Sequence, residues 1–495
     1  MRKLAVLAAA VGTLAITVLV TAQQPDALKA AAAALGVNSL KSLQFAGSGA
    51  NFSVGQNYTP AEPWPRVTVK SYTASINYDT GSMRQELLRE MGATMPRGGG
   101  APFTGEQRQV QVVSGNYAWN VAAPAQPGGA APPPAAAPGN QVERMLALWS
   151  TPQGFVKAAM MNNATTKKAK GGTEVSFTVG GKYKMTGVLN AQNDVERVQT
   201  WIDQPIVGDM LVETVYSGYK DFGGVRFPSR IAQSQDGYPA LDLTVATVTA
   251  NPAVDITVPD NVRTAQPAAV RVDSAKLGDG VFYLTGGSHH SLAVEMKDHI
   301  VLVDVPQTEQ RALAVIAKAK EVIPNKPIRY LVTSHHHWDH LGGIRAAIDE
   351  GATIVTYQTN KAFLERVAKT PHTINPDRLA ASKKPVKIQT VGAKGVLTDG
   401  LRTVELHLLT GYEHTGDMLV VYLPKEKILA EPDAFTPPAT PTTPLAPAAV
   451  PYAAALYDNI QRLKLDVQSI VPFHGGRMGD VPELARAAGK GNAGN

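Results

Sequence analysis

Short alternating and apolar runs, separated by Gly, Asn and Asp, dominate the first half of the chain. Such runs occur at residues 43–45, 110–113, 175–177, 212–216 and 241–248. Alternation with a period of two, bounded by turn residues, is typical of antiparallel strands. One helical patch, residues 141–161, interrupts them. The pattern predicts an antiparallel meander with one helical stretch.

The pattern changes after residue 277, where strands and helices alternate. The expected strands are 281–285, 291–296, 299–305, 328–334, 352–357, 403–409, 418–431 (a hairpin) and 467–473. The expected helices are 310–323, 344–351, 360–368 and 453–465. This order predicts an α/β arrangement of two mixed sheets covered by helices.

Length and histidine distribution divide the chain in two. A chain of 495 residues exceeds what one hydrophobic core usually supports, and all eleven histidines lie between His289 and His474. The segment 251–277 looks like a last strand followed by a proline-containing linker. We therefore expect a mostly β domain at 23–265 and a second domain at 270–495.

The first residues have the pattern of a secretory signal. Arg2 and Lys3 precede an apolar run from Leu4 to Val20, and Thr21-Ala22 offers a small-residue exit. Residues 1–22 therefore predict a periplasmic or secreted protein. An uncleaved signal is the alternative, and it would be the only membrane contact expected.

Composition narrows the chemistry. The chain has no cysteine, so disulfides are excluded and any metal site must use nitrogen and oxygen ligands. The net charge is +6, but Lys and Arg are scattered. Nucleic-acid binding requires a concentrated basic stripe, so we expect no nucleic-acid partner.

Two features of the first half suggest loops and a ligand. The insertions 95–105 and 123–140 are too rich in Pro and Gly to pack, and we expect mobile loops there. Residues 212–231, "VETVYSGYKDFGGVRFPSRI", resemble the strand-turn-strand of lipoprotein-carrier-like periplasmic folds. That resemblance implies a curved sheet holding an acyl chain or a lipoprotein. A purely structural sheet is the alternative.

The densest chemistry lies in "LVTSHHHWDHLGG", residues 331–343. In a tight turn after a strand, His335 and His337 can point the same way and bind one ion. Asp339 and His340 can reach a second ion from the same loop. His336 and Trp338, between them, are expected to pack or support rather than ligate.

Three further candidate ligands each follow an apolar strand or lie in a glycine-rich turn. They are His414, Asp433 and His474. With the cluster, they resemble the ordered H-x-H-x-D-H, His, Asp, His pattern of the metallo-β-lactamase superfamily, over residues 281–476. The resemblance implies an αββα sandwich. It also implies one zinc on His335, His337 and His414, and another on Asp339, His340 and His474.

The resemblance further implies that Asp433 bridges both ions and that Asp304 supports the ligand loop. It points to a di-zinc hydrolase that cleaves a small ester, thioester or lactone with a metal-bridging hydroxide, Asp339 being the catalytic residue that orients it. β-Lactam hydrolysis is one alternative. A lipid- or lipoprotein-binding envelope protein is the other. Iron or manganese remain open beside zinc.

The remaining candidates receive weaker interpretations. His299, His372 and His407 are expected to be solvent-exposed. His289 and His290 lie either in a plain turn or in a loop that touches substrate. Thr415, which follows His414, is expected to be a hydrogen-bonding support and not a substrate contact. The Pro-rich run 435–452 either shapes the mouth of the site or is inert.

Overall fold

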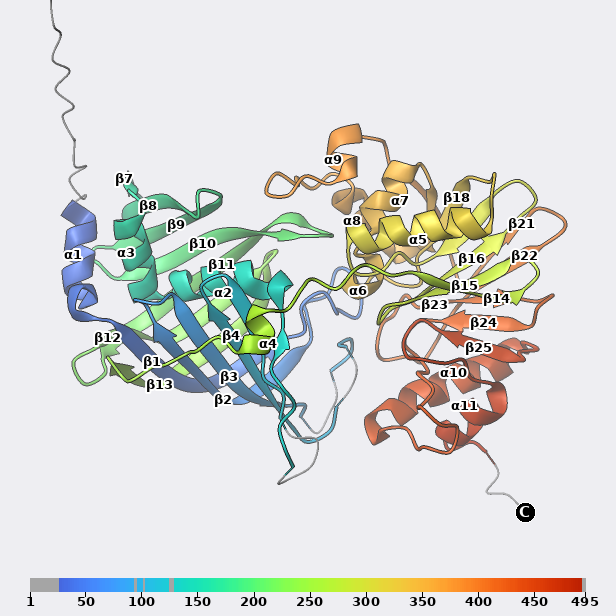
Figure 1. Cartoon of the computed structure of the whole chain (residues 1–495), viewed down its shortest axis with the longest axis horizontal. Helices are drawn as coiled ribbons and strands as arrows, with labels where there is room; N and C mark the ends of the chain where they lie inside the picture. The colour runs from blue at the N-terminus through green and yellow to red at the C-terminus, as the bar shows by residue number, and fades with distance from the viewer. Residues whose placement is uncertain (1–25, 93–95, 101–102, 124–128, 492–495) are drawn as a thin grey trace, which may run out of the picture.

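The computed structural model describes residues 26–92, 96–100, 103–123 and 129–491. The expected signal, residues 1–22, lies outside these ranges. The chain forms two bodies side by side, an N-terminal β domain and a C-terminal α/β domain (Figure 1). Among the helices that are described, none is long and apolar enough to cross a membrane.

The N-terminal domain is built on one large antiparallel sheet, as the alternating runs predict. Its strand order is β6-β5-β4-β3-β2-β1-β13-β12-β11-β10-β9-β8-β7, so most neighbours are consecutive in sequence and the pair β1–β13 joins the two halves. Its strands are β1 (Ser42–Phe52), β2 (Arg66–Asn77), β3 (Ser82–Glu90), β4 (Glu106–Ser114), β5 (Tyr117–Asn120), β6 (Ala135–Ala136), β7 (Thr165–Ala169), β8 (Gly172–Val179), β9 (Tyr183–Asn190), β10 (Val195–Gln204), β11 (Gly208–Asp221), β12 (Arg226–Gln235) and β13 (Tyr238–Ala250).

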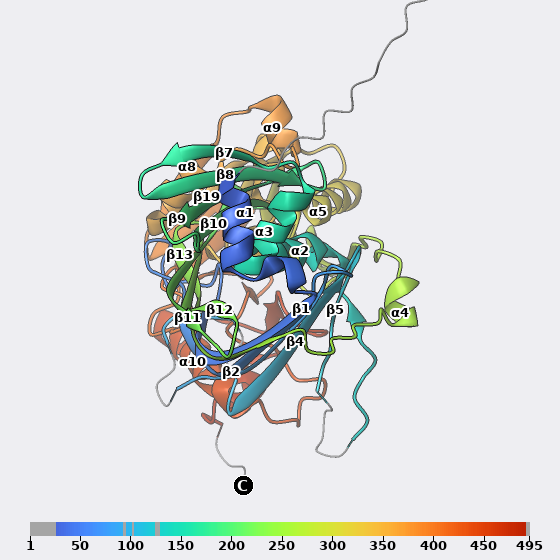
Figure 2. The same cartoon turned by 90° about the vertical axis from the view of Figure 1, so that its left-hand side faces the viewer.

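Helices fill the curve of this sheet (Figure 2). They are α1 (Asp26–Ala34), η1 (Val37–Ser39), η2 (Pro138–Asn140), α2 (Gln141–Ser150) and α3 (Pro152–Met161). The expected single helical patch is broken at Thr151, because Pro152 has no N–H to continue a helix and is suited to the first position of the next. Leu146, Leu148 and Phe155 are fully buried against the strands.

The C-terminal domain follows the short helix α4 (Asp260–Arg263) and contains two mixed sheets. The first has the order β14-β15-β16-β17-β18-β19-β20, and the second has the order β21-β22-β23-β24-β25. The strands are β14 (Asp273–Gly278), β15 (Val281–Thr285), β16 (Ser291–Glu295), β17 (Ile300–Val303), β18 (Ile328–Val332), β19 (Thr353–Tyr357), β20 (Lys387–Val391), β21 (Lys394–Thr398), β22 (Thr403–Leu408), β23 (Leu419–Leu423), β24 (Ile428–Glu431) and β25 (Ser469–Pro472).

The two sheets pack face to face and helices cover their outer faces. Val303, Val332, Leu406 and Val421 belong to the apolar layer between the sheets. The helices are α5 (Glu309–Val322), α6 (Trp338–Leu341), α7 (Ile344–Glu350), η3 (Gln358–Asn360), α8 (Lys361–Val367), α9 (Arg378–Ser382), η4 (Pro447–Ala449), α10 (Val450–Leu463) and α11 (Val481–Ala487). This is the predicted αββα sandwich, preceded by the predicted antiparallel domain.

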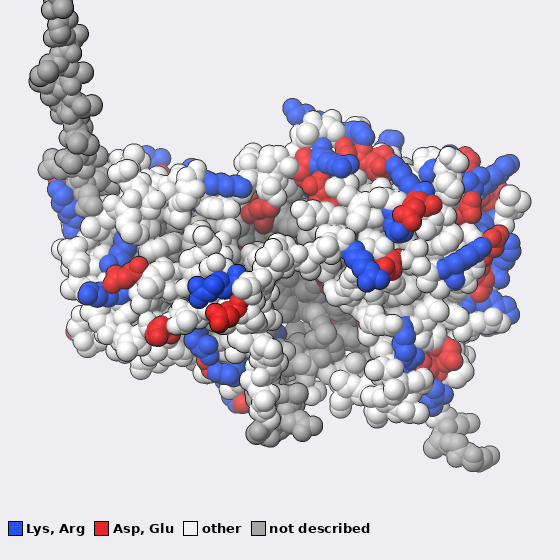
Figure 3. Space-filling view, viewed as in Figure 1, with Lys and Arg blue, Asp and Glu red and all other residues white. Residues whose placement is uncertain are grey.

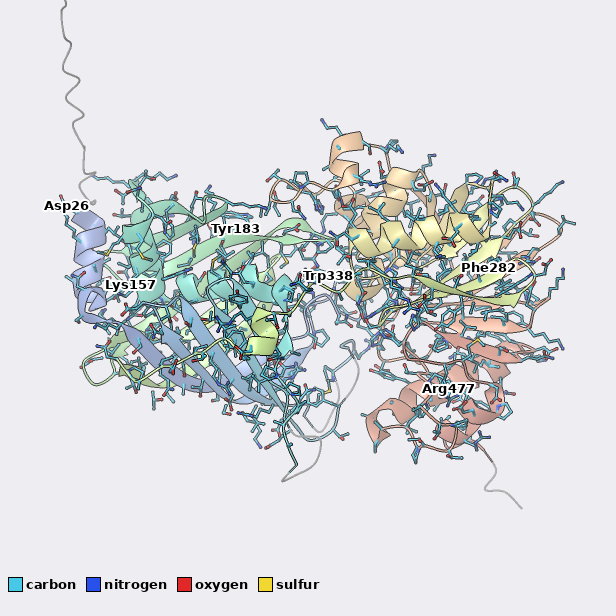
Figure 4. The ribbon with its side chains drawn as sticks, in the orientation of Figure 1. Asp26, Lys157, Tyr183, Phe282, Trp338 and Arg477 are labelled. Atoms are coloured by element: carbon cyan, nitrogen blue, oxygen red, sulfur yellow. The ribbon has the colours of Figure 1, made fainter. Side chains whose placement is uncertain are left out.

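Both sheets of the sandwich present the ends of their strands at the edge that faces the N-terminal domain. The loop after β18 carries His335 and His337, the short helix α6 that follows it carries Asp339 and His340, and the loop between β15 and β16 carries residues 286–290. The loops after β22, β24 and β25 carry His414, Asp433 and His474. Trp338, labelled in Figure 4, lies where the two domains meet. The face in Figure 3 shows acidic and basic side chains interspersed over both domains.

Candidate metal centre

All seven side chains expected to hold metal converge at this edge. Together with His289, their ligand atoms form three groups, and within each group all atoms lie within 4.8 Å of one another. The groups are His335, His337 and His414; His289, Asp339, His340 and His474; and His335, His340 and Asp433. Each group has the composition of a site for a divalent ion.

The first group consists of three buried imidazoles. Nδ1 of His337 lies 3.0 Å from Nε2 of His414. Nε2 of His337 donates to the backbone carbonyl of Asn57 at 2.8 Å, so Nδ1 is left with its lone pair toward the group. Burial, and then neighbouring imidazoles, hold the pKa of His335 and of His337 well below the usual value. Both rings are therefore neutral and able to ligate at neutral pH.

In the second group, too, a hydrogen bond to one ring nitrogen of a histidine orients the other nitrogen. Nδ1 of His340 donates to Oδ2 of Asp304 at 2.9 Å, which leaves Nε2 facing Nε2 of His474 at 3.1 Å. Asp304 also accepts hydrogen bonds from the backbone N–H and the hydroxyl of Ser334, at 2.7 and 2.6 Å. Asp304 thus orients both a ligand and the loop that carries it, as expected of a supporting carboxylate.

Asp433 lies between the first group and the second group. Its Oδ2 is 3.4 Å from Nε2 of His335, 3.2 Å from Nε2 of His340 and 3.5 Å from Nε2 of His414. Its Oδ1 is 2.9 Å from Nε2 of His474. One carboxylate therefore faces ligand atoms of both groups.

The buried polar atoms test whether these residues fit a metal. Nε2 of His335 and Oδ2 of Asp433 are buried and have no hydrogen-bond partner within the described part of the chain. An unpaired buried acceptor costs about 1–3 kcal/mol, and this cluster concentrates several in one place. Burial alone would raise the pKa of Asp433, but His340 and His414 hold it well below its usual range. Imidazoles gathered around ionised carboxylates fit a divalent cation.

His336 faces away from the metal groups, as predicted. Its Nδ1 lies 2.9 Å from Oδ1 of Asp417, and its Nε2 lies 3.2 Å from Oδ1 of Asn57. Asn360 donates to the other oxygen of Asp417 at 2.6 Å, and Thr415 donates to Oδ1. His336 and Thr415 are therefore parts of a buried network that supports the ligand loop.

A loop of the N-terminal domain enters the site, and no sequence pattern predicted it. Nε2 of Gln56 donates to Oδ1 of Asp339 at 2.8 Å, beside the Asn57 contacts described above. The backbone of Gly416 donates to the carbonyl of Tyr58 at 2.8 Å. Trp338 packs edge-to-face on Trp64, with ring centroids 5.6 Å apart. The residue pattern of this loop does not distinguish it from the other polar turns of the N-terminal domain.

One insertion expected to be a mobile loop is packed in its described part. Gly98 donates to the carbonyl of Glu413 at 2.8 Å, and Gly99 donates to that of Gln56 at 2.7 Å. For residues 96–100 the expectation was therefore wrong. One backbone hydrogen bond to the C-terminal domain and one to the loop at Gln56 hold this segment, which a count of Pro and Gly does not reveal.

The expectation that three further histidines are exposed was wrong. His299, His372 and His407 are only 3–5% exposed. His407 lies 2.8 Å from Glu405, and His299 lies 2.6 Å from Asp298 while packing on Tyr330. His372 is covered by the N-terminal domain near Gly208. Neighbouring carboxylates and an interdomain contact account for their burial.

A cavity of about 450 Å³ opens over the metal groups. Asp339, His414, Asp433 and His474 line its floor. Its walls include Gln56 and Gly100 of the N-terminal domain, and Phe435, Leu445, Ala446, Ala449 and Tyr452 of the Pro-rich run and α10. The Pro-rich run therefore shapes the mouth of the site.

One family model matches the part of the chain that carries the ligand groups. Residues 284–474 match the family model described as the metallo-beta-lactamase superfamily. Solved structures that resemble the chain include a metallo-beta-lactamase from Pontibacter korlensis, with 22% identity, a TM-score of 0.35, and coverage of 44% of this chain and 98% of that one. Another is the DIM-1 metallo-beta-lactamase, with 23% identity, a TM-score of 0.34, and coverage of 44% and 95%.

A third is the metallo-beta-lactamase FIM-1 from Pseudomonas aeruginosa in its mono-zinc form, with 22% identity, a TM-score of 0.34, and coverage of 46% and 97%. A search of curated proteins gave no match. The family match spans the loops that carry the ligand groups, and the strands around it form the αββα sandwich. Residues 284–474 form a domain of the metallo-beta-lactamase superfamily.

Proposed function

We propose that the protein is an exported hydrolase that uses two divalent metal ions to cleave a neutral ester, thioester or lactone. The observation that carries the proposal is the position of Asp433, whose two carboxylate oxygens face ligand atoms of both groups. Two ions held there would supply Lewis-acid polarisation of a carbonyl and a water of lowered pKa. Zinc is the proposed metal, because histidine and carboxylate ligands suit it.

The protein's own residues position the reaction. His335, His337 and His414 would hold one ion, and Asp339, His340 and His474 the other, with Asp433 shared. Asp339 lines the cavity, and the amide of Gln56 fixes its Oδ1. Oδ2 of Asp339 faces the second group, 3.9 Å from Nε2 of His340, and would orient the attacking water by accepting its hydrogen bond.

The cavity walls favour a neutral substrate with an apolar group. Phe435, Leu445 and Tyr452 provide apolar surface beside the metal groups. Among the described residues that line the cavity, none is Lys or Arg. The carboxylate that β-lactam antibiotics carry would therefore lack a cationic side chain there. This supports ester, thioester or lactone cleavage over β-lactam hydrolysis.

The N-terminal domain gives little support for acyl-chain binding. Its curve is filled by α2 and α3, whose apolar side chains belong to the core. The cavity of about 250 Å³ between the sheet and α2 is lined largely by amides, among them Gln85, Gln111 and Gln233. Such a lining suits water or a polar molecule better than an acyl chain. Export rests on the signal pattern of residues 1–22.

A substrate panel tests the proposal. The purified full chain, its metal content measured, is assayed with aryl esters, thioesters, γ- and δ-lactones and the chromogenic β-lactam nitrocefin. We expect turnover of neutral esters or lactones that His335→Ala abolishes and that His299→Gln, a histidine change away from the metal groups, preserves. Faster turnover of nitrocefin than of every ester and lactone would assign the β-lactam alternative. Metal-loaded protein inactive on the whole panel would reject the proposal.

A further inference from the structure

His289 belongs to the second metal group, although the family pattern in the sequence does not include it. It lies in the loop between β15 and β16, and its Nε2 is 3.1 Å from Oδ2 of Asp339. Its ring centroid is 4.1 Å from that of His474 and 5.3 Å from that of His340. A backbone bridge between His289 and His474 holds the two loops together. The loop between β15 and β16 and the loop after β25 therefore bring His289 and His474 together.

The far nitrogen of His289 is already engaged. Its Nδ1 is 2.9 Å from the hydroxyl of Ser288, and that hydroxyl accepts a hydrogen bond from Gln307 at 2.8 Å. The same arrangement occurs at His340, where Asp304 holds Nδ1, and at His337, where Asn57 holds Nε2. Ligating histidines commonly have the other nitrogen fixed in this way. Ser288 therefore directs Nε2 of His289 at the second group.

The burial of His289 agrees with this role. Its side chain is 13% exposed, so little of it is available to solvent in a loop that joins two short strands. A ring whose Nε2 lies beside a carboxylate and whose plane packs on two other imidazoles has the orientation of a ligand.

We infer that His289 is a fourth protein ligand of the second metal ion, beside Asp339, His340 and His474. The inference rests on the proposed two-metal function and deepens it. A catalytic zinc with three protein ligands keeps a position open for water or substrate. With four protein ligands and the shared Asp433, the second site would be the more enclosed. The site formed by His335, His337 and His414 would then offer the open position to the substrate.

Metal-binding measurements distinguish ligation from simple hydrogen bonding. The metal-free full chain is titrated with Co²⁺ in competition with a chelator, and the visible spectrum is recorded for the wild type, His289→Ala, His289→Gln and the control His299→Gln. Glutamine can still donate to Asp339 but is a poor metal ligand. Loss of a supporting partner weakens metal binding about 10–100-fold. Loss of a ligand should weaken the second Co²⁺ by more than about 100-fold in both His289 variants, with the first Co²⁺ unaffected.

The spectrum provides the second readout. Removal of a ligand should change the absorption of the second Co²⁺ in both His289 variants, whereas His299→Gln should match the wild type. Wild-type affinity and spectrum in His289→Gln would show a hydrogen-bonding role and overturn the inference. Wild-type behaviour of both variants would overturn it as well and leave the two-metal proposal intact. A wild-type chain that binds no second Co²⁺ would overturn the two-metal proposal and this inference together.

Discussion

The backbone carbonyl of Asn57 accepts a hydrogen bond from Nε2 of His337 at 2.8 Å, across 280 residues of sequence and a domain boundary. This bond fixes which ring nitrogen of His337 is free to ligate. The N-terminal domain therefore helps to define the metal centre, and several consequences can be measured.

The approach of the loop to the metal domain depends on Gly55. Gly55 has a φ of +73°, and a Cβ there would lie 2.5 Å from the ring of Trp338. Gly55→Ala should displace the loop and release His337 and Asp339 from their supports. We expect metal affinity, measured by chelator competition, to fall about 10–100-fold.

Gly105→Ala is a matched control. Gly105 has nearly the same φ, +72°, but a Cβ there would have no neighbour within 4 Å. The variant Gly105→Ala therefore reports the effect of backbone strain alone, and its metal affinity should equal that of the wild type. Equal losses in the two variants would mean that strain, and not the contact with Trp338, is responsible.

His335 and His336 are adjacent and should behave differently. His335→Ala should remove one metal equivalent. His336→Ala should retain both but leave Asp417, which is fully buried, without its imidazole partner. Loss of one hydrogen bond to a buried carboxylate costs about 1–3 kcal/mol, which denaturant unfolding of the metal-free protein would detect. Loss of metal from His336→Ala at normal stability would show that the ligand role has been assigned to the wrong one of these adjacent histidines.

The interdomain contact of Asp209 should weaken in acid. Burial favours a higher pKa, but hydrogen bonds from the backbone of Ile374 and from Thr373 outweigh it and hold the pKa of Asp209 below 3.8. Because the folded-state pKa is lowered, the stabilisation is complete above the unfolded value and is lost as pH falls through the folded value.

Asp209→Asn should therefore destabilise the protein above about pH 4, by about 1–2 kcal/mol, and its difference from the wild type should shrink as the pH falls below that value. Thermal unfolding from pH 3 to pH 6 measures this. Asp242→Asn, which affects only an exposed pair with Arg230, serves as the control. A difference between Asp209→Asn and the wild type that is the same at pH 3 and pH 6 would contradict the assignment.

Leu445 should determine the size of the acyl group. Leu445→Ala removes apolar wall from the cavity, so KM for esters with large apolar acyl groups should rise about 10-fold or more, with small esters affected less. Leu401, which is 74% exposed on another edge, provides the control Leu401→Ala. Equal KM changes for small and large esters would place the acyl group elsewhere.

The sequence predicted the parts of the site that depend on local pattern. His335, His337, Asp339 and His340 sit in one turn after a strand, so their direction follows from a few neighbouring residues. His414, Asp433 and His474 could be found because each follows an apolar strand or lies in a glycine-rich turn. The same reasoning found the antiparallel domain and the two mixed sheets covered by helices, whereas the αββα sandwich was implied by the resemblance to the metallo-β-lactamase superfamily.

What the sequence could not predict depends on contacts between distant segments. Gln56 and Asn57 reach the site only because the two domains pack together, and nothing near them in sequence records this. The burial of His372 has the same origin. Asp298 and Glu405 provide hydrogen-bond partners that allow the rings of His299 and His407 to be buried, whereas an alternating pattern alone places these rings at the surface. His289 could be noted as a candidate, but only its distance from Asp339 gives it a place beside the metal.

Anomalous diffraction at the zinc edge, from crystals of the full chain loaded with zinc, tests the central claim most directly. The account predicts two peaks, one among His335, His337 and His414 and the other among His289, Asp339, His340 and His474, with Asp433 in contact with both. Peaks elsewhere, or no peak among these side chains, would contradict it.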